Sequence, residues 1–207
     1  MRKNRKNKRF IYLISPNKIK EEEFYSNLNQ VLSSKKVNFF QLRLKKESLN
    51  KQIYIGKKIK KICKKHKVLF LINDNPIIAK RVNADGCHLG QKDMQLIKAR
   101  KLMGKKIIGI TCHNSLKLAK SAIKDNADYI AFGAFNLSST KKVKYKASVS
   151  LIKKAKKISN IPIVVIGGIN FNNYKKLLLN KANFLAISGY IWNNKKLKPV
   201  DAIKKLV

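Results

Sequence analysis

Three of the few acidic residues in this chain fall within one short stretch, LINDNPIIAKRVNADGCHLGQKD (residues 71–93). The chain has 48 Lys and Arg but only 10 Asp and Glu, so the positions of these three carboxylates are informative. Asp74 and Asp93 each follow a short apolar run that is typical of a buried strand. Mg²⁺ prefers oxygen ligands and usually binds one or two carboxylates together with substrate phosphates. We therefore interpret Asp74 and Asp93 as ligands of one Mg²⁺ ion.

A second group of polar residues, in QLRLK (residues 41–45), suits an anion. Gln41, Arg43 and Lys45 alternate, and alternate side chains of an extended segment share one face. Two cations and an amide on one face can bind one anionic group. Lysine is so frequent here that a solvated strand end is the simpler explanation. However, Arg43 is one of only six arginines and lies within an apolar run.

Two glycine-containing segments near the end of the chain suggest a phosphate site. IGGIN contains Gly167 and Gly168, and ISGY contains Ser188 and Gly189. If these segments follow the seventh and eighth strands of a barrel, they occupy the place where such folds commonly bind phosphate. Glycine there lets backbone N–H groups approach an anion. The alternative is a plain turn into a helix with Asn170 as its N-cap.

The elements that would position these residues are eight short apolar runs separated by lysine-rich amphipathic stretches. The runs are Phe10–Ile14, Asn38–Arg43, Val68–Ile72, Gly86–Leu89, Ile107–Thr111, Tyr129–Phe132, Ile163–Ile166 and Phe184–Ile187. Several are apolar on both faces, as parallel strands covered by helices are. We predict an α/β fold, a single compact (β/α)8 TIM barrel over residues 10–207. A doubly wound open sheet is the alternative, but its glycine fingerprint is missing after the first run.

One phrase recurs before three of these runs, in VNADGCHLG, DNADYIAFG and NKANFLAISG. A repeated helix-to-strand junction favours a repeated β/α unit. We therefore interpret Asp85 and Asp128, which lie in this junction, as structural residues. His88 is expected to point into the barrel or to orient a neighbour, and His113 is close enough to the fifth strand end to contact a substrate.

The net charge of +38 is compatible with a protein that binds nucleic acid or another polyanion. Yet 42 of the 48 basic residues are Lys, spread over every predicted helix, which favours a solvated outer face. We expect a flexible basic tail at residues 1–9, no specific nucleic-acid partner and no membrane segment. The three cysteines lack CxxC spacing, which suggests reduced thiols in the cytoplasm. A homo-oligomer is compatible with the sequence.

Taken together, the motifs resemble those of the thiamine phosphate synthase family. They are, in order, YLIS, QLRLK, LINDNPIIAKRVNADGCHLGQKD, IIGITCH, ADYIAFGAFNLSSTK, IPIVVIGGIN and ISGYIW, and they span nearly the whole chain after Arg9. The resemblance implies a transferase that couples 4-amino-5-hydroxymethyl-2-methylpyrimidine diphosphate with a thiazole phosphate. Thiamine phosphate and diphosphate would be the products of a Mg²⁺-assisted dissociative substitution, in which the thiazole nitrogen captures a pyrimidine carbocation.

The resemblance also implies roles for individual residues. The pyrimidine diphosphate would be bound by Gln41, Arg43, Lys45, Asn73, Thr111 and Lys141. Catalytic roles would fall to Arg43, Lys45 and Lys141. The thiazole phosphate would be bound by Ser138, Ser139, Thr140, Gly168, Ile187 and Ser188. Mg²⁺ would be held by Asp74 and Asp93.

The sequence departs from the family pattern at a few positions. Leu44 stands where many members have Glu, Thr111 where Ser is common, and SST (residues 138–140) where Thr-Pro-Thr or Thr-Glu-Thr is usual. ANF (residues 182–184) replaces Ala-Asp-Gly, which we interpret as structural. The nearest alternative function is a thiazole tautomerase-like isomerase on the same barrel. Such relatives tend to lose the diphosphate and metal residues that this chain keeps. Polyanion binding is the remote alternative.

Overall fold

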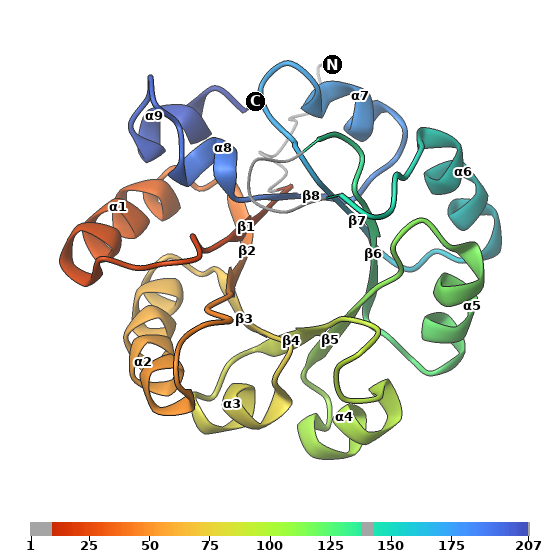
Figure 1. Cartoon of the computed structure of the whole chain (residues 1–207), viewed down its shortest axis with the longest axis horizontal. Helices are drawn as coiled ribbons and strands as arrows, with labels where there is room; N and C mark the ends of the chain where they lie inside the picture. Colours follow the sequence, from red (N-terminus) through yellow and green to blue (C-terminus); the bar gives the residue numbers. More distant parts are fainter. Residues whose placement is uncertain (1–9, 138–142, 207) are drawn as a thin grey trace, which may run out of the picture.

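Eight short strands, most of them buried on both faces, close into one parallel barrel in the computed structural model (Figure 1). The structure describes residues 10–137 and 143–206. The strands are β1 (Ile11–Ile14), β2 (Val37–Leu42), β3 (Leu69–Asn73), β4 (Gly86–Leu89), β5 (Ile107–Thr111), β6 (Tyr129–Gly133), β7 (Ile163–Ile166) and β8 (Phe184–Ile187). Each pairs with its neighbour in sequence, and β8 pairs with β1. The predicted (β/α)8 barrel is confirmed, with every strand boundary within one residue of its expected position.

Helices surround the barrel as an outer ring (Figure 1). They are α1 (Glu21–Ser33), α2 (Leu49–Lys65), α3 (Pro76–Arg81), α4 (Leu96–Met103), α5 (Leu116–Lys124), α6 (Val149–Ile158), α7 (Tyr174–Leu179), α8 (Gly189–Trp192) and α9 (Pro199–Lys204). None of the helices in the described part of the chain is both long enough and apolar enough to span a bilayer. The predicted basic tail, residues 1–9, lies outside the described residues.

Helix α2 illustrates why the lysine-rich stretches become helices. Ile55, Ile59 and Cys63 repeat at intervals of four residues and form one buried stripe, while lysines fill the opposite face. The hydroxyl of Ser48 caps the start of the helix by accepting a hydrogen bond from the Lys51 N–H at 3.3 Å. The lysine excess therefore lies largely on helix faces that point away from the barrel.

Two apolar layers fill the molecule. The larger layer lies between the strands and the helices and includes Phe40, Phe70 and Phe132. The smaller one fills the interior of the barrel with alternate strand residues, Tyr12, Ile14, Phe39, Leu69, Leu71, Ile107, Tyr129, Ala131, Val164, Ile166, Phe184 and Ala186. The interior is thus a packed core, as expected of a barrel of eight strands. Polar residues that continue these inward series appear only toward the carboxyl ends of the strands.

The recurring junction has one structural role at all three of its positions. Asp85, Asp128 and Asn183 each use a side-chain oxygen to accept a backbone N–H of the preceding strand, at 2.7, 2.7 and 2.9 Å. Each also donates its own N–H to the carbonyl of that same residue, at 2.8 to 2.9 Å. The structural interpretation of Asp85 and Asp128 is confirmed, and the Asn of the ANF segment serves the same purpose.

Replacing Asp85 by Ala should therefore cost stability without altering the barrel mouth. The substitution removes the acceptor of the Phe70 N–H and the partner of Lys60, whose Nζ lies 2.6 Å from the carboxylate. An unpaired, largely buried N–H costs about 1–3 kcal/mol, so the free energy of unfolding in urea should fall by that amount. Asp85→Asn is the matched control and should cost less, since Asn183 performs this role with an amide. Equal losses for Ala and Asn would contradict the assignment.

Candidate active site

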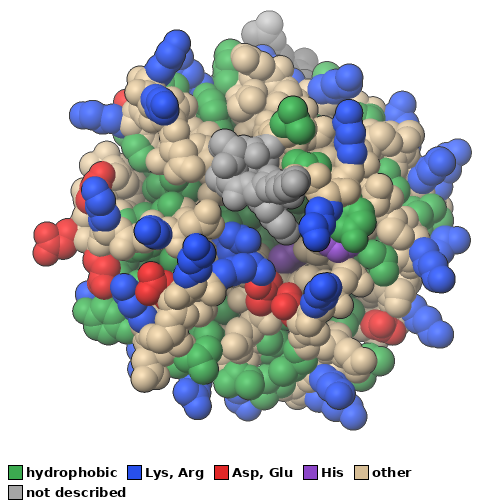
Figure 2. All heavy atoms as spheres, viewed as in Figure 1, with side chains coloured by type: hydrophobic (Ala, Val, Ile, Leu, Met, Phe, Trp, Pro, Cys, Tyr) green, Lys and Arg blue, Asp and Glu red, His purple; other side chains and the backbone are tan. Residues whose placement is uncertain are grey.

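The candidate site lies over the barrel, where the polar ends of the inward-facing series meet the loops. Figure 2 shows acidic, basic and histidine side chains gathered at the centre of this face, while the remaining lysines and arginines are scattered around its periphery. Asn73 and Thr111 end strands β3 and β5 and continue inward-facing series. The parallel arrangement thus brings residues that are far apart in sequence to one opening.

Asp74 follows β3 directly and is held in an unusual conformation. Its φ of 63° lies in the left-handed region, which non-glycine residues seldom adopt. Its N–H donates to the carbonyl of His88 on the neighbouring strand at 2.7 Å, and its carboxylate pairs with the Lys45 ammonium at 2.5 Å. Such conformations tend to occur where function requires a fixed side-chain direction.

Asp93 follows β4 and is fixed by a local turn. Its Oδ2 accepts the N–H of Gly90 at 2.7 Å. Burial raises the pKa of the Asp93 carboxyl, and the neighbouring Asp74 carboxylate raises it further. The two carboxylates that were predicted to share a metal are therefore close enough to repel one another. Among the residues that the structure describes, no cluster of three acidic, histidine or cysteine side chains could hold a metal ion.

The cations of QLRLK approach the same region. Arg43 is half-buried, its guanidinium donates to Asn17 Oδ1 at 2.9 Å, and its N–H donates to Ser15 Oγ at 2.9 Å. Burial lowers the pKa of Arg43, an effect that Asp74 partly offsets. The intervening Leu44 is buried in the outer core, so its side chain does not face the mouth.

Beneath the charged groups, five side chains form a continuous hydrogen-bonded chain across the barrel interior. Gln41 Nε2 donates to the Tyr12 hydroxyl at 3.1 Å, and the hydroxyls of Tyr12 and Tyr129 are 2.7 Å apart. His88 contacts Tyr129 through Nδ1 at 2.8 Å and Thr111 Oγ1 through Nε2 at 2.7 Å. His88 was predicted to point into the barrel or to orient a neighbour, and its contacts with Tyr129 and Thr111 confirm this. Burial lowers the pKa of His88 to about 4, which makes its imidazole neutral at pH 7.

On the other side of the mouth, the loops after β6 and β7 pack tightly together. The Asn136 N–H donates to the Gly167 carbonyl at 3.1 Å, and a Cβ on Gly168 would lie 2.0 Å from the Leu137 carbonyl oxygen. Gly168 has φ 56°, which also favours glycine. Helix α7 begins only at Tyr174 and follows Asn173, so the alternative with Asn170 as N-cap was wrong. Ser138, Ser139, Thr140 and Lys141 lie outside the described residues.

The ends of β8 and β1 complete the ring. Ser188 donates through its hydroxyl to the Ser15 carbonyl at 3.1 Å. The side chain of Ile187 is buried in the outer core, so any contact that Ile187 makes with a ligand in the mouth must come from its backbone. His113, which follows β5, stacks on Tyr145 with ring centroids 4.3 Å apart.

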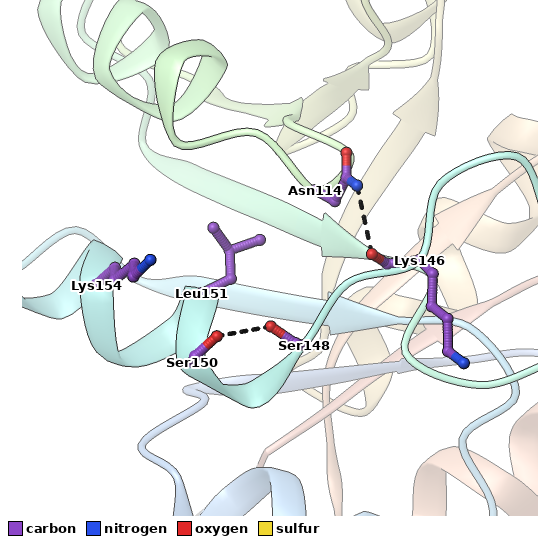
Figure 3. Close-up of a pocket in the computed structure, with 6 residues that line it drawn as sticks. All are labelled: Asn114, Lys146, Ser148, Ser150, Leu151 and Lys154. Atoms are coloured by element: carbon purple, nitrogen blue, oxygen red, sulfur yellow. Dashed lines mark hydrogen bonds between the residues drawn. The ribbon is translucent and has the colours of Figure 1, made fainter.

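A separate pocket of about 240 Å³ lies beside α6, lined by Asn114, Lys146, Ser148, Ser150, Leu151 and Lys154 (Figure 3). It contains none of the predicted site residues. The two lysine side chains lie at opposite sides of the close-up rather than converging (Figure 3). The arrangement therefore does not form a cradle for one anion.

Sequence reasoning missed four residues that support the site. Tyr12 and Tyr129 lie within predicted strands, and Ser15 and Asn17 follow the first of these strands, but no functional role was predicted for any of them. A usable signal existed for the tyrosines: each occupies an inward position on a strand, where a buried hydroxyl needs a partner. The partners themselves come from strands that are distant in sequence, and only the closed barrel identifies them.

Comparison with known proteins gives consistent similarities. The family model described as thiamine monophosphate synthase matches residues 11–191. A thiamine-phosphate synthase of Pelagibacter ubique is 68% identical over 206 residues, covering 100% of both chains. A thiamine-phosphate synthase of Erythrobacter litoralis is 36% identical over 95% of this chain and 94% of its own. A solved structure of a Pyrococcus furiosus thiamine phosphate pyrophosphorylase superposes with a TM-score of 0.85 at 26% identity, covering 97% of this chain and 94% of its own.

The tight packing behind Gly168 predicts a large effect of adding one methyl group. Gly168→Ala adds a clash with the Leu137 carbonyl to the strain of a positive φ. Gly104→Ala is the matched control, because Gly104 has φ 57° but no atom within 4 Å of the added Cβ. We expect the control to lower the free energy of unfolding by about 1–3 kcal/mol, the cost of backbone strain alone, and Gly168→Ala to lower it by more than the control. If both variants lost the same free energy of unfolding in urea, the close approach of the Leu137 carbonyl to Gly168 would not restrict this position.

Proposed function

The chain belongs to the thiamine monophosphate synthase family, and from this premise we propose how its barrel mouth joins the two substrates. Its activity is that of a thiamine-phosphate synthase, a transferase that couples a pyrimidine diphosphate with a thiazole phosphate. The observation that carries the site assignment is the carboxylate pair Asp74 and Asp93, with Lys45 and Arg43 beside it, in a chain otherwise poor in acids.

The donor set at the mouth fits Mg²⁺. The Asp74 carboxylate helps to raise the pKa of Asp93 on the adjacent strand end, and a divalent cation would relieve that repulsion. Two carboxylates, with no third acidic, histidine or cysteine ligand among the described residues, leave coordination positions for diphosphate oxygens. When bound by Asp74 and Asp93, Mg²⁺ would neutralise charge that develops on the leaving diphosphate.

Arg43 and Lys45 are proposed to hold that diphosphate. Arg43 offers a planar fork whose position is fixed through Asn17 and Ser15, which suits a phosphate group. Its partial burial strengthens the interaction, because charges attract more strongly away from water. Lys45 now pairs with Asp74, and we propose that the substrate takes over part of this contact. Lys141 is proposed to assist the same group, although it lies outside the described residues.

We propose that bond breaking precedes bond making, with no nucleophile supplied by the described residues. The C–O bond between the pyrimidine methylene and the diphosphate breaks, the diphosphate keeps the electron pair, and the thiazole nitrogen supplies the pair for the new C–N bond. The interior beneath the mouth is uncharged, since His88 is neutral. All three cysteines are buried, which raises the pKa of their thiols and makes them poor nucleophiles. The site therefore acts through positioning and charge neutralisation.

The thiazole phosphate is proposed to bind the opposite side of the mouth. Gly168 lies in the loop after β7, Ile187 ends β8 and Ser188 follows it, and this is the part of the mouth where barrels commonly bind phosphate. Ser138, Ser139 and Thr140 would complete this site. Ser188 and Arg43 both contact Ser15, so the two halves of the mouth share one support.

Metal dependence is the first expected result. Purified protein given both substrates and Mg²⁺ should form thiamine phosphate and release diphosphate in equal amounts. EDTA should abolish the activity, and added Mg²⁺ should restore it, because two carboxylates alone cannot neutralise the diphosphate. Full activity in the presence of EDTA would contradict the metal assignment. Isomerisation of a thiazole phosphate without coupling would favour the isomerase alternative.

Removing single charges from the mouth should reduce turnover while the fold is retained. Asp74→Asn and Arg43→Ala are each expected to lower kcat by about 10²–10³-fold, since each removes a group that acts on the developing charge. Arg81→Ala, on the exposed end of α3, is the matched arginine control and should retain full activity. Circular dichroism should be unchanged in all three variants. Normal turnover in both mouth variants would overturn the site assignment.

A further inference from the structure

The hydrogen-bonded chain from Gln41 to Thr111 can be given a direction by counting donors and acceptors. The amide nitrogen of Gln41 has no lone pair with which to accept, so it donates to the Tyr12 hydroxyl. Of the two partners of Tyr12, only the Tyr129 hydroxyl can then accept the Tyr12 proton. Tyr129 has in turn one proton to donate, and its remaining partner is His88 Nδ1.

The same count fixes the tautomer of His88. If Nδ1 accepts from Tyr129, it carries no proton, so the one N–H of the ring is on Nε2. That N–H donates to Thr111 Oγ1, which is 2.7 Å away. The hydroxyl hydrogen of Thr111 is thereby directed away from His88. Each step depends on the one before it, so all the hydrogen bonds run in one direction across the barrel.

We propose that Tyr12, Tyr129 and His88 are positioning residues, which present the Gln41 Oε1 as an acceptor and the Thr111 hydroxyl as a donor to the pyrimidine diphosphate. This inference rests on the proposed function, because the two ends of the chain are proposed binding residues. An exocyclic amino group of the pyrimidine suits the Gln41 oxygen. A ring nitrogen or a diphosphate oxygen suits the Thr111 hydroxyl.

Burial makes this chain rigid and keeps its protons in place. Tyr12, Tyr129 and Gln41 are each only 2% exposed, and no buried side-chain nitrogen or oxygen in the described part of the protein lacks a partner. Burial raises the pKa of both tyrosines, so both phenols remain donors at any pH the enzyme would meet. In a low-dielectric interior, the bonds within such a network reinforce one another.

The tautomer gives a test that does not depend on catalysis. In ¹⁵N-labelled wild-type protein at neutral pH, the imidazole nitrogens of His88 should report a neutral ring protonated at Nε2, with the assignment checked against His88→Gln. Tyr129→Phe removes the donor to Nδ1 and should weaken this preference. Protonation at Nδ1 in the wild-type protein would reverse the direction of the chain and overturn the proposal.

Kinetics test the link to the substrate. Tyr12→Phe and Tyr129→Phe should each lower kcat/KM for the pyrimidine diphosphate about tenfold, the effect of one misdirected hydrogen bond, while KM for the thiazole phosphate stays unchanged. Because either substitution interrupts the same chain, the double variant should lose about as much as the worse single variant. Tyr174→Phe removes the hydroxyl of another fully buried tyrosine and serves as the matched control, with kinetics like wild type.

The possible outcomes distinguish failure of the positioning role from failure of the proposed synthase function. A hundredfold loss of kcat/KM in the double variant would show that the two tyrosines act independently. Equal losses of kcat/KM for both substrates, together with lowered thermal midpoints, would show a general structural effect. Either result would overturn the positioning role. His88→Gln should retain more activity than His88→Leu, because an amide can still donate and accept; the reverse order would contradict the chain. Failure of the wild-type enzyme to couple its substrates would overturn the proposed function itself, whatever the tautomer.

Discussion

Repulsion between two carboxylates is the constraint on which the candidate site depends. Asp74 and Asp93 are held at the ends of adjacent strands by hydrogen bonds with the backbone, and burial together with the Asp74 carboxylate disfavours the ionised form of Asp93. In the structure described here, Lys45 offsets this repulsion on one side. A divalent cation that shares both carboxylates would offset it more fully. We propose that this arrangement binds a metal together with the anionic group that the metal neutralises.

The closed barrel makes this arrangement possible, because it fixes groups that would otherwise separate. Closure pairs β8 with β1 and directs eight strand ends into one opening. Residues such as Asp85, at the other end of the strands, stabilise the fold by satisfying backbone groups. Asp74, at the mouth, instead occupies a strained conformation with φ 63°. The fold thus supplies the stability that lets the site hold a costly geometry.

The sequence was sufficient to predict the strands, the barrel and the positions of the acids, because each depends on local patterning. Apolar runs set the strand boundaries, and the ends of parallel strands are where barrels place function. The chain from Gln41 through Tyr12 and Tyr129 was not predictable, since its members are separated by up to 117 residues and meet only after closure. The N-cap at Asn173 was also missed, because several asparagines compete there and tertiary packing decides among them.

The most direct measurement of the central claim is anomalous diffraction from crystals soaked with Mn²⁺ and diphosphate. We expect one strong manganese peak between the carboxylates of Asp74 and Asp93, with diphosphate oxygens completing its coordination and Arg43 contacting the same diphosphate. A manganese peak at another place, or diphosphate bound without metal and away from both carboxylates, would contradict the account.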